Sequence, residues 1–315
     1  MIRFGIMGAG SIARKFVDAV AQVEDAQVVA VASKSQERAS GFAQEKGIAH
    51  AYGSYEEMLS RGDIDAVYIA TTMNFHYENI KQCLHWGKHV LCEKCMVLNS
   101  KQAEEVFSLA KEKGLFVMEC MWVRFLPKIE KVKEWIDKGR IGTLKLAQGN
   151  LGFRAAVDPD SRMYSPALGG GAMYDLGVYL VEVLGYFAQE ELSDVQSTVI
   201  RAFTGVDETV NFNLRYGEYL VNCQCSIAAA LPENAYLYGE DGYIVMEKFH
   251  VGDRVKLYGK DGKLEEEYGQ EDVNGFVYQV REAVRCIQGG LLESKIASHK
   301  MTLECCSVFD KCLAQ

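Results

Sequence analysis

The sequence predicts an α/β protein of two domains: a doubly wound parallel sheet, followed by an α+β domain with an open, mainly antiparallel sheet. Three observations predict this. Strand-like and helix-like patterns alternate through residues 1–122, long alternating strands joined by turn dipeptides follow, and 315 residues exceed the roughly 250–300 at which one core stops growing. We place the first domain at 1–122, the second at 123–298, and a last helix, 299–315, that returns to the first domain.

The first domain is read from apolar runs of β type separated by helical spacing. Residues such as Ile12, Phe16, Ala19 and Val20 recur as they do on one helix face. Strands joined through helices pair in parallel, with right-handed crossovers. The expected strands are Ile2–Met7, Gln27–Ala32, Ala66–Ala70, His89–Cys92 and Leu115–Met118.

From about residue 123 the pattern changes. After one helix at Pro127–Lys138, alternating stretches at 208–216 and 219–227 are joined by turn dipeptides such as Tyr216-Gly217, which predicts antiparallel hairpins. Further helices are expected near 172–187, 274–288 and 299–313.

Composition excludes several classes of function. The chain is 49% hydrophobic and 24% charged, with a net charge of −9 and no basic block, so neither nucleic acid nor an anionic membrane surface is an expected partner. We found no signal-peptide pattern and no uncharged apolar run of the ~18 residues that a membrane span needs. We therefore expect a cytoplasmic protein, and we expect its ten cysteines to be reduced packing residues.

A glycine motif, "GIMGAGSIARKF", follows the first strand. Gly8 permits a tight turn, Gly10 lets backbone amides approach a pyrophosphate, and Ala13 allows close packing of helix and strand. The helix that starts at Ser11 and Ile12 adds the partial positive charge of its N-terminus. The motif predicts dinucleotide binding.

The end of the second strand indicates which dinucleotide is bound. A carboxylate that would bond the ribose 2′-hydroxyl of NAD is missing there, and Ser33-Lys34 stands in its place with Arg38 one helical turn later. Two cations favour a 2′-phosphate. NADP(H) is therefore preferred, and NAD remains possible because Ser-Lys also occurs on ordinary solvated surfaces.

The stretch "HVLCEKCMV" allows two interpretations, a metal or redox Cys-x-x-Cys and an acid/base site. Because it ends a parallel strand, Glu93 and Lys94 emerge at the ligand-binding edge of the sheet. A redox pair normally opens a helix, and a structural zinc site needs a second ligand pair, for which Cys223-x-Cys225 has the wrong spacing. We favour the acid/base site and expect no metal.

Longer motifs resemble a known family. "ATTMNFHYENI" and "GKHVLCEK" are similar to the signatures of the Gfo/Idh/MocA oxidoreductases, and "ECMWVRFLP" and "FRAAVDPDSRMYSPALGGGAMYDLGVYLV" resemble its trans-1,2-dihydrodiol dehydrogenase and D-xylose dehydrogenase-like branch. The similarity spans nearly the whole chain. Family members usually have proline where this chain has Met73 and Cys95, and the second replacement could alter the backbone that aims Lys94.

The resemblance implies a Rossmann nucleotide-binding domain and a pyridine-nucleotide dehydrogenase with Lys94 as its catalytic lysine. The other catalytic position falls after Gly169-Gly170-Gly171, where Asp175 and Tyr179 stand four residues apart on one helical face. The expected cofactor contacts are Gly8, Gly10, Ser11, Ile12, Ser33, Lys34, Arg38, Thr71, Thr72, Asn74, His76, Glu93, Lys94, Trp122 and Arg124. The expected substrate contacts are Phe153, Arg154, Arg162, Asp175 and Tyr179.

Hydride transfer to or from a secondary alcohol also needs a group that accepts or donates the hydroxyl proton. A nearby Lys cation favours the phenolate of a Tyr, so Lys94 and Tyr179 are chemically sufficient as an acid/base pair.

Structural alternatives remain for the other positions. Asp175 could satisfy backbone donors, His76 could cap a helix, and Trp122 with Arg124 could join the domains. Arg154 and Arg162 could be solvated, and a helical Tyr is often a packing residue.

We expect a sugar, polyol or cyclic diol as substrate. We also expect a homodimer or higher homo-oligomer through the second sheet, whose apolar face includes Val210, Phe212 and Leu214. Two alternatives stay open: a glycosidase of this fold that uses NAD transiently, and a nucleotide-sensing protein without turnover.

Overall fold

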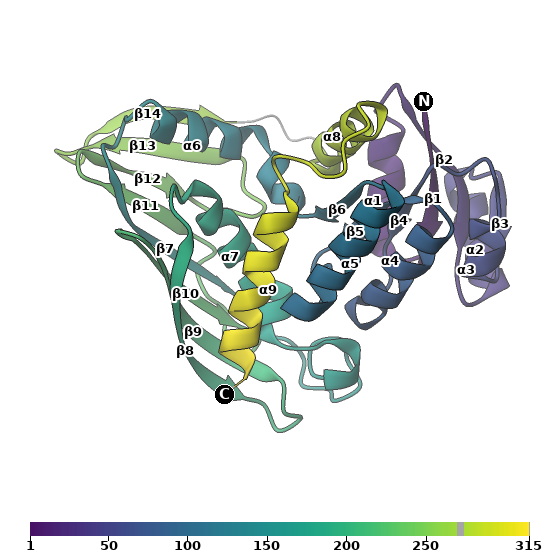
Figure 1. The fold of residues 1–315 in the computed structure, drawn as a ribbon. Helices are drawn as coiled ribbons and strands as arrows, with labels where there is room; N and C mark the ends of the chain where they lie inside the picture. Colours follow the sequence, from purple (N-terminus) through teal and green to yellow (C-terminus); the bar gives the residue numbers. More distant parts are fainter. Residues whose placement is uncertain (270–273, 315) are drawn as a thin grey trace. The chain divides into compact units, whose positions relative to one another are not determined.

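The computed structural model describes residues 1–269 and 274–314, which divide into two compact units (Figure 1). The first unit contains Met1–Trp122 and Asn274–Leu303, and the second contains the described residues of Val123–Val273 and Glu304–Gln315. Residues 274–298 thus belong to the first unit and not, as the sequence predicted, to the second. The physical reason is that helix α8 (Phe276–Gln288) packs its buried face against helix α1 (Ser11–Val20). The last helix, α9 (His299–Leu313), begins in the first unit and continues in the second.

The first unit is a parallel sheet in the order β3-β2-β1-β4-β5-β6, which confirms the doubly wound prediction. Its strands are β1 (Ile2–Met7), β2 (Ala26–Ala32), β3 (His50–Tyr52), β4 (Ala66–Ile69), β5 (His89–Glu93) and β6 (Val117–Cys120). The crossovers contain α1, α2 (Gln36–Lys46), α3 (Tyr55–Leu59), a 3₁₀ turn (Met73–Phe75), α4 (His76–His85) and α5 (Ser100–Lys113). The central strands β4 and β5 are almost entirely buried, as strands covered on both faces must be.

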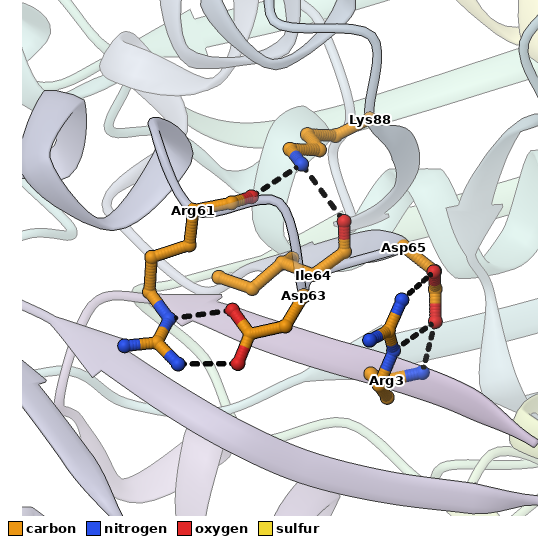
Figure 2. Close-up of polar contacts among 6 residues, drawn as sticks. All are labelled: Arg3, Arg61, Asp63, Ile64, Asp65 and Lys88. Carbon is orange, nitrogen blue, oxygen red and sulfur yellow. Dashed lines mark hydrogen bonds and ion pairs between the residues drawn. The ribbon is translucent and has the colours of Figure 1, made fainter.

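A polar network holds the amino ends of these strands together (Figure 2). The Arg3 guanidinium forms an ion pair of 2.7 Å with Asp65, which also accepts a bond of 2.8 Å from the backbone N–H of Arg3. The ammonium group of Lys88 donates to the backbone carbonyls of Arg61 and Ile64 at 2.7 and 2.8 Å. These charged groups stabilise the sheet at the amino ends of its strands. The candidate site described below lies at the opposite edge, at the carboxyl ends.

The second unit is built on a mixed sheet in the order β14-β13-β12-β11-β7-β10-β9-β8. Its strands are β7 (Leu144–Gly152), β8 (Leu192–Arg201), β9 (Asp207–Tyr216), β10 (Tyr219–Ser226), β11 (Ala235–Gly239), β12 (Gly242–Met246), β13 (Arg254–Gly259) and β14 (Leu264–Gly269). Among the described strands of this second sheet, only β7 and β10 pair in parallel. The sheet is therefore mainly antiparallel, as predicted.

Helices cover one face of this second sheet. Helix α6 (Pro127–Asp137) packs on β13 and β14, and a π-helical turn (Met173–Gly177) with helix α7 (Val178–Leu184) packs on β10 and β7. Among the described residues, the stretch Pro166–Phe187 is long and apolar enough to cross a membrane by length and composition, but 78% of its apolar window is buried in the protein. It is therefore accounted for as a core segment.

The face that we expected to bind a second subunit is the covered one. Val210, Phe212 and Leu214 are 0–1% exposed within the single chain, so that prediction was wrong for these residues. Strand alternation identifies an apolar face without identifying what covers it. Part of the cover comes from α9, where Phe309 packs against Tyr174 at a ring-centroid distance of 5.1 Å (Figure 1).

Candidate active site

In the first unit, the predicted cofactor residues gather at the carboxyl edge of the sheet. Met7 is in register with Ala32 of β2 and Ile69 of β4, and Ile69 is in register with Cys92 of β5. The loops that follow these strands therefore start at one edge, which is where open parallel sheets bind ligands.

The glycine turn after β1 has the geometry that a phosphate cradle needs. Gly8 has φ +100°, and a Cβ there would lie 2.6 Å from the carbonyl oxygen of Ala70, so both conformation and space require glycine. A Cβ on Gly10 would meet no atom within 4 Å among the described residues beyond its chain neighbours. Protein packing thus does not explain glycine at that position, whereas close approach by a bound pyrophosphate does.

Helix α1 begins directly at this turn. In the part of the chain that the structure describes, no side chain caps its N-terminus, and its first turn, which starts with Ser11 and Ile12, contains no acidic residue. Its first N–H groups and the positive end of the helix dipole are thus available to an anion. These residues fit the pyrophosphate of a dinucleotide.

The loop after β2 carries the residues that should discriminate between the two cofactors. Ser33 is buried, and Lys34 and Arg38 are exposed. Ser35 caps helix α2 by accepting a bond of 3.3 Å from the backbone N–H of Arg38. The Lys34 ammonium lies 3.9 Å from the centroid of the Phe75 ring, which belongs to the loop after β4, so the two loops meet at this cation.

The loop after β4 is joined to the loop after β5 by His76. Its Nδ1 lies 2.9 Å from the carbonyl oxygen of Cys95, and its Nε2 lies 3.0 Å from that of Thr71. Burial lowers the pKa of His76, and a neutral ring can donate to only one of these oxygens at a time. His76 therefore links two loops and is 1% exposed, which leaves little of it for a cofactor.

Three further polar residues lie in this loop, and one of them, Asn74, points to a bound group. The Thr71 hydroxyl accepts a bond of 2.9 Å from Asn79, and Thr72 precedes the 3₁₀ turn. The Oδ1 atom of Asn74 is buried and has no hydrogen-bond partner among the described residues. A buried acceptor of this kind is costly unless a ligand or water supplies a donor.

Glu93 and Lys94 follow β5. Glu93 is 7% exposed, and its Oε1 accepts a bond of 2.5 Å from the Tyr68 hydroxyl. Burial raises the pKa of Glu93 to about 7. The Tyr68 ring stacks on the Phe16 ring of α1 with the ring centroids 3.7 Å apart, so the hydrogen-bond partner of Glu93 is itself held in place. Lys94 is half-buried, and the peptide bond that joins it to Cys95 is cis.

Trp122 and Arg124 each have a partner within the protein. Trp122 packs against Phe276 of α8 at 5.7 Å. Arg124 is 4% exposed and forms a buried ion pair of 2.9 Å with Glu182, and its Nε donates to the Glu182 carbonyl oxygen at 2.7 Å. The structure thus gives Arg124 a role in fixing α7, and the distant partner Glu182 was not detectable from the motif.

In the second unit, a glycine turn and a buried acid position the helix that carries the candidate Tyr. Gly171 has φ +125°, and a Cβ there would collide with the carboxylate of Asp207. That carboxylate accepts a bond of 2.6 Å from the Met173 N–H, at the start of the π-helical turn. Burial raises the pKa of Asp207 to about 6.

Asp175 and Tyr179 have different neighbours. Asp175 is 8% exposed and forms an ion pair of 2.7 Å with the half-exposed Arg162, so two predicted substrate residues contact each other. Tyr179 is half-buried, and its ring lies 5.5 Å from the His250 ring. Phe153 and Arg154 are exposed in the loop that follows β7. Sequence reasoning missed His250 because a single His in a loop carries no pattern.

The cysteines offer no alternative chemistry. All ten are buried, and burial raises the pKa of both Cys92 and Cys120 well above the ordinary range of a thiol. In the part of the chain that the structure describes, no group of three or more His, Cys, Asp or Glu side chains could hold a metal ion.

Two family models match the chain. Residues 2–120 match an oxidoreductase family with an NAD-binding Rossmann fold, GFO_IDH_MocA, and residues 129–245 match the GFO/IDH/MocA C-terminal domain.

Curated relatives and solved structures are similar over nearly the full length. The chain is 34% identical to the trans-1,2-dihydrobenzene-1,2-diol dehydrogenase of Mus musculus, over 94% of this chain and 91% of that protein. It is 32% identical to the scyllo-inositol 2-dehydrogenase (NADP(+)) IolU of Bacillus subtilis (strain 168), over 100% and 97% of the two chains. It superposes with a TM-score of 0.87 and 26% identity on KijD10, a 3-ketoreductase from Actinomadura kijaniata in complex with NADP and TDP-benzene, over 99% and 96%.

Proposed function

Because the chain belongs to the Gfo/Idh/MocA oxidoreductase family, we propose that it transfers a hydride between NADP(H) and a secondary alcohol or carbonyl of a sugar, polyol or cyclic diol. The relatives named above are dehydrogenases of a cyclic diol and an inositol. One observation carries the proposal. The Gly8 turn and the α1 N-terminus, which follow β1, lie at the same edge of the first sheet as Lys94, which follows β5.

The preference for NADP rests on Lys34 and Arg38. Both cations are exposed beside the N-terminus of α2, a place that favours an anion such as the 2′-phosphate. Glu56 lines the same surface hollow as Lys34 and opposes this preference. We expect Lys34→Ala and Arg38→Ala each to weaken NADP⁺ binding by about 10-fold, with NAD⁺ binding unchanged. Equal losses for both cofactors would contradict the assignment, and Lys101→Ala, an exposed lysine of α5, is the matched control.

In the reaction, the C–H bond of the alcohol breaks and its electron pair leaves as hydride to the nicotinamide, while the hydroxyl proton passes to the protein. NADP⁺ supplies the hydride acceptor when it is bound. Tyr179 takes the proton, and the Lys94 ammonium stabilises the negative charge that develops on the oxygen. In the direction of reduction, Tyr179 returns the proton to that oxygen. Glu93, packed beside Lys94, keeps the backbone of the β5 end in place through Tyr68.

A reduction assay tests the proposal. NADP⁺ is incubated with aldoses, inositols and cyclic diols, and reduced nicotinamide is followed with the wild type, Lys94→Ala and Tyr179→Phe. We expect losses of several orders of magnitude in kcat for Lys94→Ala, with NADP⁺ binding mostly kept. Undiminished activity of that variant would remove Lys94 from the mechanism.

The same assay separates the two alternatives. A glycosidase that uses the cofactor transiently would release a leaving group without a net change in reduced nicotinamide. A nucleotide-sensing protein would bind NADP⁺ and turn over none of the substrates.

We also propose that the protein is a homodimer through the uncovered face of the second sheet. Strand register places an uncharged row on β10, β7, β11, β12 and β13, consisting of Leu220, Leu146, Tyr238, Tyr243 and Tyr258, and on β9 this row continues with Arg215. On β9, β10 and β7 the next two rows consist of amides: Asn213, Asn222, Gln148, Asn211, Gln224 and Asn150. The Tyr243 and Tyr258 rings stack at 4.7 Å, and Leu220 is 50% exposed.

A second copy suits this face for two reasons. Each copy has a net charge of −9, and an interface with few charged residues limits repulsion between copies. Amides carry both donors and acceptors and can pair with themselves. Interstrand spacings of about 4.8 Å make the eight-stranded sheet roughly 34 Å wide, so three full rows, which include charged positions such as Arg215 and Lys256, offer on the order of 600 Å². That area approaches the ~800 Å² per partner of a standard interface.

Sedimentation tests the dimer. The chain mass is 35.1 kDa, and we expect the wild type to sediment at about twice this mass and the double variant Leu220→Glu/Tyr238→Lys to sediment as a monomer. Leu291→Glu, at an equally apolar residue of the first unit that is 40% exposed, should leave the dimer intact. A monomeric wild type, or a dimer that survives the double substitution, would refute the interface.

A further inference from the structure

The imidazole of His250 lies beside the candidate proton-transfer residue of the second unit. The rings of His250 and Tyr179 are 5.5 Å apart between centroids, with their planes inclined at 52°. His250 comes from the loop between β12 and β13, and Tyr179 comes from α7, so two separate elements bring these rings together. This contact has no part in the function proposed above.

The loop that carries His250 is anchored on both sides of that residue. Phe249 is fully buried, and its N–H donates to the carbonyl oxygen of Glu233 at 2.9 Å. On the other side, the ammonium group of the fully buried Lys128 donates to the carbonyl oxygen of Gly252. A loop fixed at two points presents its side chain in one place, as a positioning residue requires.

The segment before β11 supports the same loop and brings a carboxylate to it. Glu233 Oε2 lies 3.9 Å from His250 Nδ1, the distance of an ion pair when the ring is protonated. The side chain of the next residue, Asn234, accepts a bond of 3.3 Å from the Lys248 N–H. This distance is longer than a hydrogen bond, so the carboxylate acts on the ring through its charge.

We propose that His250, fixed by its anchored loop and with Glu233 nearby, is a positioning residue that orients the Tyr179 phenol for proton transfer. This inference rests on the proposed function, because it concerns how Tyr179 performs the proton transfer assigned to it there. A protonated His250 places positive charge beside the phenol, whereas a neutral ring only packs against it.

Other charged groups near the loop have their own partners. Glu247 pairs with Lys256 at 3.1 Å, and Asp253 lies 3.8 Å from Arg254. We therefore assign the Glu233 carboxylate to His250.

Three variants test the proposal: His250→Phe keeps an aromatic ring and removes the charge, His250→Gln keeps a hydrogen-bonding group, and Glu233→Gln removes the carboxylate. We expect His250→Phe to lower kcat by about 10- to 100-fold, the scale of a misplaced catalytic group, with KM for NADP⁺ unchanged. It should also shift the pH at which kcat/KM is half-maximal. Glu233→Gln should act in the same direction, and combining the two should add little, because both act through one contact.

Controls separate the possible failures. His50→Phe, at an exposed residue of β3 in the first unit, should behave as the wild type. If Tyr179→Phe abolishes activity but His250→Phe changes neither kcat nor the pH profile, this inference fails and the proposed function stands. If Tyr179→Phe is fully active, the proposed function fails. If His250→Phe does not fold, His250→Gln decides by the same two readouts.

Discussion

The buried carboxyl of Glu93 makes stability depend on pH in a direction opposite to that of ordinary surface acids. Its pKa is raised from 4.5 to about 7, and burial is the main cause. Between these two values the folded chain holds a proton that the unfolded chain releases. Stability is therefore fully present below about pH 4.5 and falls as pH rises through 7.

The size of the effect follows from the shift. Each pKa unit corresponds to about 1.36 kcal/mol, so the whole shift is worth about 3 kcal/mol, of which about 2.5 kcal/mol is lost between pH 5 and pH 8. Glu93→Gln keeps an acceptor for the Tyr68 hydroxyl and cannot ionise. We expect the stability of this variant relative to the wild type to increase by about 2.5 kcal/mol between pH 5 and pH 8.

The assay must report on the first unit alone. Samples without cofactor are equilibrated in urea at pH 5, 6, 7 and 8 and then pulse-labelled with deuterium at one fixed pH, and the peptides of β4 and β5 are analysed by mass spectrometry. Glu104→Gln, at an exposed acid of α5, is the control and should show no pH-dependent difference. A difference between Glu93→Gln and the wild type that is the same at pH 5 and pH 8 would refute the reasoning.

Three further substitutions have defined outcomes. Gly8→Ala places a Cβ 2.6 Å from the Ala70 carbonyl oxygen, so it should lower the free energy of unfolding by about 1–3 kcal/mol and NADP⁺ affinity by at least 10-fold. Unchanged NADP⁺ binding in calorimetry would contradict the phosphate cradle. Glu182→Ala removes the carboxylate that pairs with the buried Arg124, so it should lower the free energy of unfolding, measured by urea titration, by about 3–5 kcal/mol. The double variant Arg124→Leu/Glu182→Met should restore most of this loss. His76→Phe unlinks two loops, so hydrogen exchange of residues 94–98 should rise at least several-fold, whereas unchanged exchange would show that His76 is not the link.

Much of the fold could be predicted from the sequence, because local patterns carry it. The strand Ile2–Met7 and the turn at Tyr216-Gly217 were placed correctly, since each has its own apolar period or turn residue. The three-residue strand β3 was missed, because so short a strand has no period of its own. The expected strand Leu115–Met118 lies at Val117–Cys120, because all residues of this run are apolar or buried and its register comes from pairing with β5.

The candidate site was predictable only where it consists of contiguous motifs. The glycine turn and the Glu93-Lys94 pair lie at strand ends, and their position follows from the topology. Partners that are distant in the sequence left no signal: Glu182 beside Arg124, Tyr68 beside Glu93 and His250 beside Tyr179. Side-chain chemistry alone does not identify such pairs, because the three-dimensional fold determines them.

The division of the chain between the two units has a consequence for its synthesis on the ribosome. The first unit requires residues 274–303, and the second requires residues from 304 onward, whose Glu304 and Phe309 side chains contact Tyr216 and Tyr174. Neither unit can therefore complete its core while the nascent chain is shorter than about 300 residues, although domains often fold one after another during translation. We expect a ribosome-stalled chain ending near residue 260 to remain sensitive to protease in both units.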